Sequence, residues 1–244
     1  MKIINLIIAL MLNLIGFTTT HASKSDITIL ADESIHWEAL NPARGEQSPL
    51  AANLWGDRTQ AGATGFLVQF KKSFSSPPHI HNVSYRGIVI QGELHNDDPQ
   101  AASLWMPANS YWTQPAGESH ITAAQGESNL AYIEIEAGPY LVHSTEQAFD
   151  NGERPVNIHA DNLVWLDAHD LTWIHKNKAV AELLGIKVAL LWGSPSSKQS
   201  YGLLLKLPAN ITVNIHSKST EFHSIVIQGK LDHSVNGQSS ETQL

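Results

Sequence analysis

The feature that most restricts the fold of this chain is a motif that occurs twice. The segment IVIQGEL at residues 88–94 recurs as IVIQGKL at residues 225–231, and LWG at residues 54–56 recurs at residues 191–193. Both pairs have the same offset of 137 residues (229 minus 92, and 192 minus 55). A fixed offset is the signature of an internal repeat. The sequence therefore predicts two similar units.

Each unit has the pattern of a succession of short β-strands. Runs such as TGFLVQF and LAYIEIEAG are rich in β-branched and aromatic residues and are bounded by Gly, Pro, Asn and Asp. Further runs of this kind in the first unit are ITIL, ANLWG, YRGIVIQGEL, ASLWM and YWTQP. One stretch, Lys178–Leu184, has a helical pattern, and we assign it a structural role. The predicted fold class is all-β, with the strand rhythm of a jelly-roll barrel.

Three histidines are candidate metal ligands. His79 and His81 are separated by one residue, so in a strand both side chains point to the same face. His120 follows the turn-like segment PAGESH, in which Pro115 and Gly117 favour a tight loop. Three neutral imidazoles that converge on one point can bind a divalent transition metal and leave coordination positions open for water, substrate or oxygen. A His-x-His pair alone is a weak signal in a chain with 13 histidines.

These residues resemble the two sequence motifs of the cupin superfamily. In that family the first motif has a histidine pair, a glutamate and a closing glycine, and the second has a proline-glycine turn and a third histidine, all on one small β-barrel. The matching residues are His79, His81 and Gly92 for the first motif, and Pro115, Gly117 and His120 for the second. The resemblance implies a cupin jelly-roll with His79, His81 and His120 as metal ligands.

The chain departs from the cupin pattern at three positions. Tyr85 stands where the family has its ligand glutamate, Asn109 replaces the first glycine of the second motif, and Ala124 replaces its asparagine. Because Tyr85 shares the odd-numbered face with His79 and His81, we expect it in the same pocket, where it could donate a hydrogen bond to a substrate. The implied site resembles the three-histidine cupins, such as cysteine dioxygenase and the acetylacetone-cleaving dioxygenase.

We expect three segments along the chain: a signal peptide at residues 1–22, a first cupin barrel with the metal site at 23–150, and a second barrel at 151–244. The second barrel has Asn214-Ile215-His216 in place of His-x-His and no counterpart of PAGESH before Leu244. It is therefore expected to be truncated, without the second motif and its closing strands. Either another segment completes it, or an exposed strand edge invites pairing into a homodimer.

The first residues have the pattern of a signal peptide. Lys2 precedes an apolar run from Ile3 to Phe17, and the small and polar residues that follow favour cleavage after Ala22. The run is short for a membrane span and is interrupted by asparagines, so an uncleaved anchor is the second alternative. This pattern predicts a periplasmic or secreted protein that has no membrane association after cleavage. The chain has no cysteine, so its stability depends on packing and metal, without disulfides.

The charge pattern restricts the partners. The net charge is −8 and no Lys/Arg cluster is present, which argues against nucleic acids and anionic membranes. No phosphate-binding loop or nucleophile elbow is present. A small-molecule substrate or ligand is the expected partner.

Two functions of different kinds fit the sequence, and whether the protein is an enzyme stays open. The first is an iron-dependent dioxygenase-like enzyme that acts on a small enolisable or phenolic substrate. The alternative is a non-catalytic cupin that binds a metal or small ligand as a sensor or carrier, and a sugar isomerase ranks third. Iron is the first choice of metal and zinc the next, while imidazole ligands also suit manganese, nickel and copper.

Overall fold

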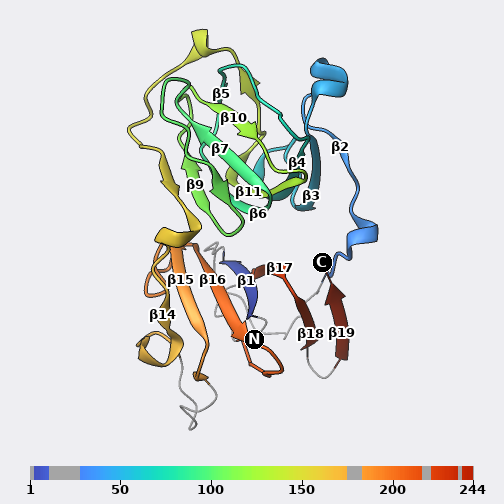
Figure 1. Cartoon of the computed structure of the whole chain (residues 1–244), viewed down its shortest axis with the longest axis vertical. Helices are drawn as coiled ribbons and strands as arrows, with labels where there is room; N and C mark the ends of the chain where they lie inside the picture. Colours follow the sequence, from blue (N-terminus) through green and yellow to red (C-terminus); the bar gives the residue numbers. More distant parts are fainter. Residues whose placement is uncertain (1–2, 11–27, 175–182, 216–220, 236–237, 244) are drawn as a thin grey trace, which may run out of the picture. The chain divides into compact units, whose positions relative to one another are not determined.

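The computed structural model describes residues 3–10, 28–174, 183–215, 221–235 and 238–243 (Figure 1). The chain divides into two compact units. The first unit is Ser34–Leu163, and the second consists of Met1–Glu33 and Val164–Leu244. The boundary expected at residue 150 lies inside the first unit, because strand β13 (Val156–Ile158) pairs with β9 (Tyr111–Gln114) of that unit.

The first unit is a barrel of antiparallel strands. Its large sheet has the order β13-β9-β6-β11-β4-β3-β2, a three-stranded sheet has the order β10-β7-β8, and β12 pairs with β5. The remaining strands are β2 (Glu38–Ala39), β3 (Leu50–Trp55), β4 (Gly62–Phe70), β5 (Ile80–His81), β6 (Tyr85–Gln91), β7 (Glu93–Asp97), β8 (Met106–Pro107), β10 (Ile121–Ala124), β11 (Asn129–Gly138) and β12 (Val142–His143). Short 3-10 helices are η1 (Asp32–Ser34), which crosses the unit boundary, η2 (Pro42–Gln47), η3 (Thr145–Gln147) and η4 (Ala160–Asn162).

The core of the first unit lies between the large and the three-stranded sheets. Alternate residues of β4 and β11 point into it, because successive side chains of a strand point to opposite faces. Leu94 of β7, Met106 of β8 and Ala124 of β10 pack against them from the other sheet, whose strands lie in front of β9, β6 and β11 in Figure 1. The buried residues of this core are Ala51, Phe66, Val68, Phe70, Tyr85, Val89, Leu94, Met106, Trp112, Ala124, Ala131, Ile133 and Ile135. Two sheets around one core confirm the predicted all-β jelly-roll.

The run YRGIVIQGEL, expected as one strand, forms two strands in different sheets. The chain bends at Gly92, which lies between β6 and β7 and has φ of 82°. A Cβ at this position would lie 2.3 Å from the carbonyl oxygen of Ser128, so only glycine fits. The closing glycine of the motif is therefore the point where the chain passes from the large sheet to the small one.

Three other expectations differ from the structure or lie outside it. Residues 28–30 of the run ITIL are not in a strand. Of the run ASLWM, only Met106 lies in a strand, because the pairing of β8 with β7 is limited to Met106 and Pro107. Most of the expected helix Lys178–Leu184 lies outside the described residues. Among the described helices, none is both long enough and apolar enough to span a membrane.

The second unit contains a five-stranded sheet in the order β14-β15-β16-β1-β17 and a hairpin of β18 and β19. Its elements are β1 (Ile3–Leu10), β14 (Leu166–Asp167), η5 (Ala168–Asp170), β15 (Lys187–Trp192), β16 (Tyr201–Pro208), β17 (His223–Gln228), β18 (Lys230–Val235) and β19 (Gln238–Gln243). β1 pairs antiparallel with both β16 and β17. Residues 3–10 of the predicted signal peptide thus form a strand of this sheet.

The place of β1 in the second unit matches the place of β11 in the first. β11 lies between β4 and β6, and the 137-residue offset moves these two strands to residues 199–207 and 222–228, where β16 and β17 lie. β1 lies between β16 and β17. The gene duplication itself stays a prediction, but the shared strand order supports it.

Candidate metal centre

Backbone pairing brings the three candidate histidines together. His79 and His120 form an antiparallel bridge, in which each backbone N–H donates to the other residue's carbonyl oxygen at 3.0 Å. The Gly117 N–H donates to the His81 carbonyl oxygen at 2.8 Å, which fixes the PAGESH turn against β5. Main-chain hydrogen bonds therefore join the two motifs, and this pairing brings the three histidine side chains close together.

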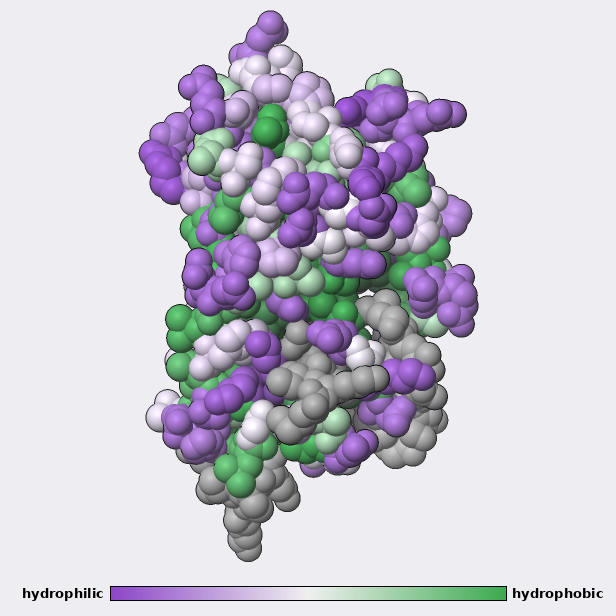
Figure 2. Space-filling model, in the orientation of Figure 1, coloured by the Kyte–Doolittle hydropathy of each residue, from purple (hydrophilic) through white to green (hydrophobic). Residues whose placement is uncertain are grey.

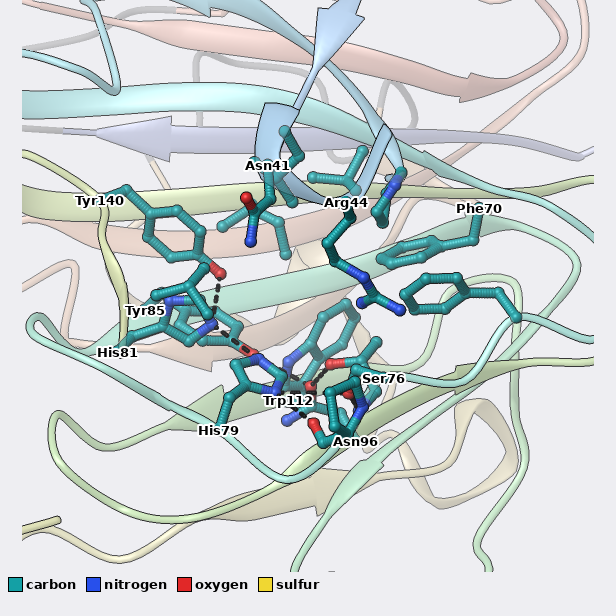
Figure 3. Close-up of a pocket in the computed structure, with 18 residues that line it drawn as sticks. Asn41, Arg44, Phe70, Ser76, His79, His81, Tyr85, Asn96, Trp112 and Tyr140 are labelled. Carbon is teal, nitrogen blue, oxygen red and sulfur yellow. Dashed lines mark hydrogen bonds between the residues drawn. The ribbon is translucent and has the colours of Figure 1, made fainter. Parts of the chain in front are cut away.

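The imidazole nitrogens converge on one point. One ligand nitrogen from each of His79, His81 and His120 lies within 4.8 Å of the others. The Nε2 atoms of His79 and His81 are 3.2 Å apart (Figure 3). Two nitrogens bound to one metal at about 2.0–2.1 Å are roughly 3 Å apart, so this spacing suits a shared ion. His81 and His120 are buried, and His79 is partly exposed.

The other ring nitrogen of each histidine faces a backbone carbonyl oxygen. The Nδ1 atoms of His79, His81 and His120 lie 3.0, 3.0 and 3.1 Å from the carbonyl oxygens of Pro77, Leu141 and Glu118. A carbonyl oxygen only accepts, so each Nδ1 carries the proton and each neutral ring presents a lone pair on Nε2. Carbonyl partners on the far nitrogen are typical of histidines that bind metals.

Burial keeps the three rings neutral. Desolvation is the main cause that lowers the pKa of all three histidines, to about 3 for His120 and well below the usual range for His81. Neighbouring imidazoles lower the pKa values of His81 and His120 further, and the Arg44 guanidinium adds a smaller effect at His79. Neutral imidazoles are the form that binds a metal, so the site fits a divalent metal without loss of protons at neutral pH.

Two tyrosine hydroxyls approach the same point. The Tyr140 hydroxyl donates to His81 Nε2 at 3.0 Å, and the Tyr85 oxygen lies 3.3 Å from His120 Nε2. Burial raises the pKa of both phenols, so both keep their protons. Tyr85 lies in the pocket, as expected from its place on β6, whereas Tyr140 has no motif to mark it and was missed in the sequence.

A buried amide chain orients Tyr85. The Tyr85 hydroxyl donates to Asn96 Oδ1 at 3.0 Å, and the Asn96 side-chain amide donates to Gln114 Oε1 at 2.9 Å. Gln114 in turn donates at 3.3 Å to the carbonyl oxygen of Glu118, which is the oxygen that orients His120. One network therefore positions both Tyr85 and His120.

The site opens into a small cavity of about 120 Å³. Its wall is mainly apolar and aromatic (Figure 3). The residues that line it are Leu40, Asn41, Arg44, Pro49, Val68, Phe70, Phe74, Ser76, Pro77, His79, His81, Tyr85, Asn96, Trp112, Thr122, Ile133, Tyr140 and Val142. The cavity is close in size to the roughly 150 Å³ cavity that holds benzene in an engineered protein, so it suits a small ligand.

Other polar candidates from the sequence lie elsewhere. Glu134 and Glu136 alternate with isoleucines in the sequence, a pattern that predicts a solvated strand face more than a pocket role. In the structure Glu134 is buried, pairs with Arg86 and accepts from Tyr132, whereas Glu136 is exposed. The place of His95 just after the IVIQGEL run predicts a residue at the barrel rim, but His95 is buried with Nδ1 3.3 Å from the Leu104 carbonyl oxygen. None of these three residues belongs to the histidine cluster.

The second unit shows no comparable cluster in the part of the chain that the structure describes. His223 lies 3.8 Å from Glu221, and burial is the main cause that lowers its pKa. His216, the counterpart of His81 in the sequence, lies outside the described residues.

Comparisons with known proteins give a family and similar folds. A family model described as "Domain of unknown function (DUF4437)" matches residues 28–244. No curated protein matches the chain significantly. Among solved structures, an RmlC-like cupin from Shewanella frigidimarina is 13% identical, with 46% of this chain and 93% of that chain covered and a TM-score of 0.37.

Two further similar structures have comparable scores. An RmlC-like cupin from Ralstonia eutropha is 16% identical, with 54% of this chain and 80% of that chain covered and a TM-score of 0.40. The polyketide cyclase RemF from Streptomyces resistomycificus is 14% identical, with 49% of this chain and 85% of that chain covered and a TM-score of 0.40. The antiparallel barrel and the three-histidine geometry of the first unit agree with what the resemblance in the sequence implies.

Proposed function

Because the chain belongs to the family of domains of unknown function DUF4437, we propose its function from the site itself: the first unit binds a divalent transition metal through His79, His81 and His120. The observation that carries this proposal is the shared orientation of the three rings. Each Nδ1 faces a backbone carbonyl oxygen, and the Nε2 lone pairs of His79 and His81 lie 3.2 Å apart. Neutral imidazoles that direct their Nε2 lone pairs to one point are the form in which histidines bind a metal.

The finer proposal is an iron-dependent dioxygenase-like enzyme for a small enolisable or phenolic substrate. When bound, iron would supply redox chemistry with oxygen and a Lewis-acid site for a substrate oxygen. The three histidines form one side of the site, and the cavity on the other side admits a compact ligand. The mainly apolar wall lowers the local dielectric constant, which strengthens polar contacts within the site.

The two tyrosines have different roles in this proposal. Tyr140 directs its hydroxyl proton toward the convergence point, whereas Tyr85 gives its proton to Asn96 and presents an oxygen lone pair toward His120. Tyr140 can therefore donate to a substrate oxygen directly. Tyr85 would donate to the substrate only after its hydroxyl turns away from Asn96, and until then it accepts.

Elemental analysis tests the proposed ligand set. Protein purified from its native compartment is expected to carry about one metal ion per chain, with iron the first expectation and zinc the second. His81→Ala should abolish stoichiometric metal, because only two ligands remain. His36→Ala, at an exposed histidine outside the cluster, is the control and should retain it. Retention of metal by His81→Ala would refute the ligand assignment.

Oxygen uptake separates an enzyme from a binding protein. The iron-loaded protein is expected to consume oxygen with a β-dicarbonyl or catechol-like compound, and His120→Ala should eliminate the uptake. If the native protein carries zinc and the iron form consumes no oxygen across a broad panel, the function is metal or ligand binding as a sensor or carrier. We further propose that the protein is exported after removal of residues 1–22, and N-terminal sequencing of exported protein tests this.

A further inference from the structure

The cavity beside the histidines has a strongly one-sided charge. Among the residues that line it, Arg44 is the one with a permanent charge, and none is Asp or Glu. An imidazole that binds a metal through a ring nitrogen carries no charge, so a divalent metal held by the three histidines would retain its two positive charges. Together with Arg44, the cavity would hold about three positive charges and no carboxylate. Such a cavity favours an anionic ligand.

The loop that carries Arg44 is held in a defined shape. Leu40 N–H donates to the Pro49 carbonyl oxygen at 2.8 Å, which closes the loop at its base. Inside it, the Asn41 side chain accepts from Ala43 N–H at 3.2 Å, and Ser48 Oγ accepts from Asn41 N–H at 2.9 Å. The outer side of this loop is hydrophilic in Figure 2, while Arg44 turns toward the cavity in Figure 3. The loop therefore directs one cation inward.

The Arg44 guanidinium has an aromatic neighbour and no protein anion. It lies 5.3 Å from the ring centroid of Phe74, at cation–π distance. It forms no hydrogen bond or ion pair with any residue in the described ranges of the chain. Arg44 lines the same cavity as His79 and His81, so its charge faces the space beside the histidine cluster. A half-buried guanidinium without a carboxylate partner has its donors free for a ligand.

We propose that Arg44 binds the carboxylate of a small ligand whose apolar body fills the cavity. The inference rests on the proposed function in one respect: the end of the ligand opposite its carboxylate would face the proposed metal. The planar guanidinium matches a carboxylate through two parallel hydrogen bonds. Phe70, Phe74 and Trp112 provide apolar and aromatic walls for the body of the ligand.

The dimensions of the cavity favour a carboxylate over larger anions. Its volume of about 120 Å³ admits a ligand near the size of benzene, such as a simple aromatic or short-chain acid. The substrate class is therefore a compact apolar monocarboxylate, in which a hydroxyl or keto oxygen could also reach the metal.

Benzoate and benzamide form a matched probe pair, because they share shape and size and differ in charge. Metal-free and zinc-loaded protein would be titrated with each compound by calorimetry. We expect benzoate to bind about tenfold or more tightly than benzamide in both forms, since a charged hydrogen-bonded pair is involved. In the metal-free protein, Arg44→Met should remove this preference and leave benzamide affinity unchanged, while Arg44→Lys should retain part of it. In the zinc-loaded protein, Arg44→Met should reduce the preference, because the metal charge still favours benzoate.

The control is Arg154→Met, because Arg154 pairs with Asp150 outside the cavity, and this variant should keep the full preference. If metal-free Arg44→Met keeps the full preference, or if metal-free wild-type protein shows no preference or binds neither compound at millimolar concentration, the inference is overturned. Circular dichroism and metal content check that the variants are folded. A failure of the metal proposal would appear separately, as metal retention in His81→Ala, while the metal-free titration would still report on Arg44.

Discussion

At the scale of single residues, the site depends on which nitrogen of each imidazole carries the proton. The three histidines come from different segments, yet each places Nδ1 against a main-chain carbonyl oxygen. The backbone thus selects the tautomer before any ligand binds. This arrangement accounts for three neutral rings, two of them buried, that present their lone pairs to one point.

The lowered pKa values predict how many protons metal binding releases. At pH 6, three histidines with the usual pKa near 6.5 would release about two protons per metal ion. Because burial lowers the pKa of all three, we expect fewer than one proton per ion at this pH. Calorimetry of zinc binding in buffers with different ionisation enthalpies measures this number. A release of two protons would show that the rings are protonated at pH 6.

Removal of the Tyr85 hydroxyl should affect turnover more than metal content. Tyr85→Phe is expected to weaken turnover by about 1–2 kcal/mol, as for the loss of one neutral hydrogen bond, because Tyr85 is a neighbour of the site and not a metal ligand. Tyr140→Phe is the companion variant, since Tyr140 donates directly toward the convergence point. Oxygen uptake and elemental analysis measure the two effects. Loss of metal in Tyr85→Phe would mean that the phenol is itself a ligand.

At the scale of elements, the turn between β9 and β10 delivers the third histidine. Gly117 has φ of 78°, and a Cβ there would lie 2.4 Å from the Phe149 carbonyl oxygen. The turn is also hydrogen-bonded to His81 through the Gly117 N–H. The position therefore needs glycine for both conformation and space.

Gly117→Ala is expected to destabilise the first unit by about 2–4 kcal/mol and to weaken metal binding, because strain and a backbone clash add. Gly152→Ala is the matched control, since Gly152 has φ of 88° but a Cβ added there would have nothing within 4 Å. The free energy of unfolding of Gly152→Ala should fall by only about 1 kcal/mol, from backbone strain, and this variant should keep its metal. Chemical denaturation and metal titration measure both. Equal losses in the two variants would show that close contact at Gly117 is unimportant.

At the scale of the whole molecule, the two units complete their sheets differently. The first unit uses β11, which lies between β4 and β6, whereas the second uses β1 from the beginning of the sequence. The same residues, 3–10, belong to the segment that the sequence predicts to be removed on export. Removal would leave the facing edges of β16 and β17 without their shared partner, and exposed edges favour pairing with another chain.

Hydrogen exchange can measure this dependence. A chain that begins at Ser23 is expected to exchange faster at residues 201–208 and 223–228 than the full chain, because both ladders with β1 are lost. Residues 62–70 and 85–91 of the first unit serve as the control, and their exchange should not change. Unchanged exchange in both pairs of segments would indicate that β1 does not hold the second sheet together.

The sequence determined the local features of this protein, because strand patterns and turn residues act over short distances. Alternation of apolar residues predicted the strands, and the spacing of His79, His81 and His120 predicted the site, as did the position of Tyr85 on the same face. The motifs also identified Gly92 as the closing glycine of the first motif and Gly117 as the turn glycine of the second. These signals come from chemistry that a short stretch of chain contains in itself.

The tertiary structure decided what depends on contacts between distant segments. Tyr140 reaches His81 across 59 residues, and Arg44 enters the cavity from a loop that has no motif. Glu134 is buried because Arg86 and Tyr132 provide partners from the folded sheet, although its alternating pattern indicated a solvated face. The strand that lies between β16 and β17 comes from the opposite end of the sequence, because backbone hydrogen bonds between strands do not depend on side-chain identity.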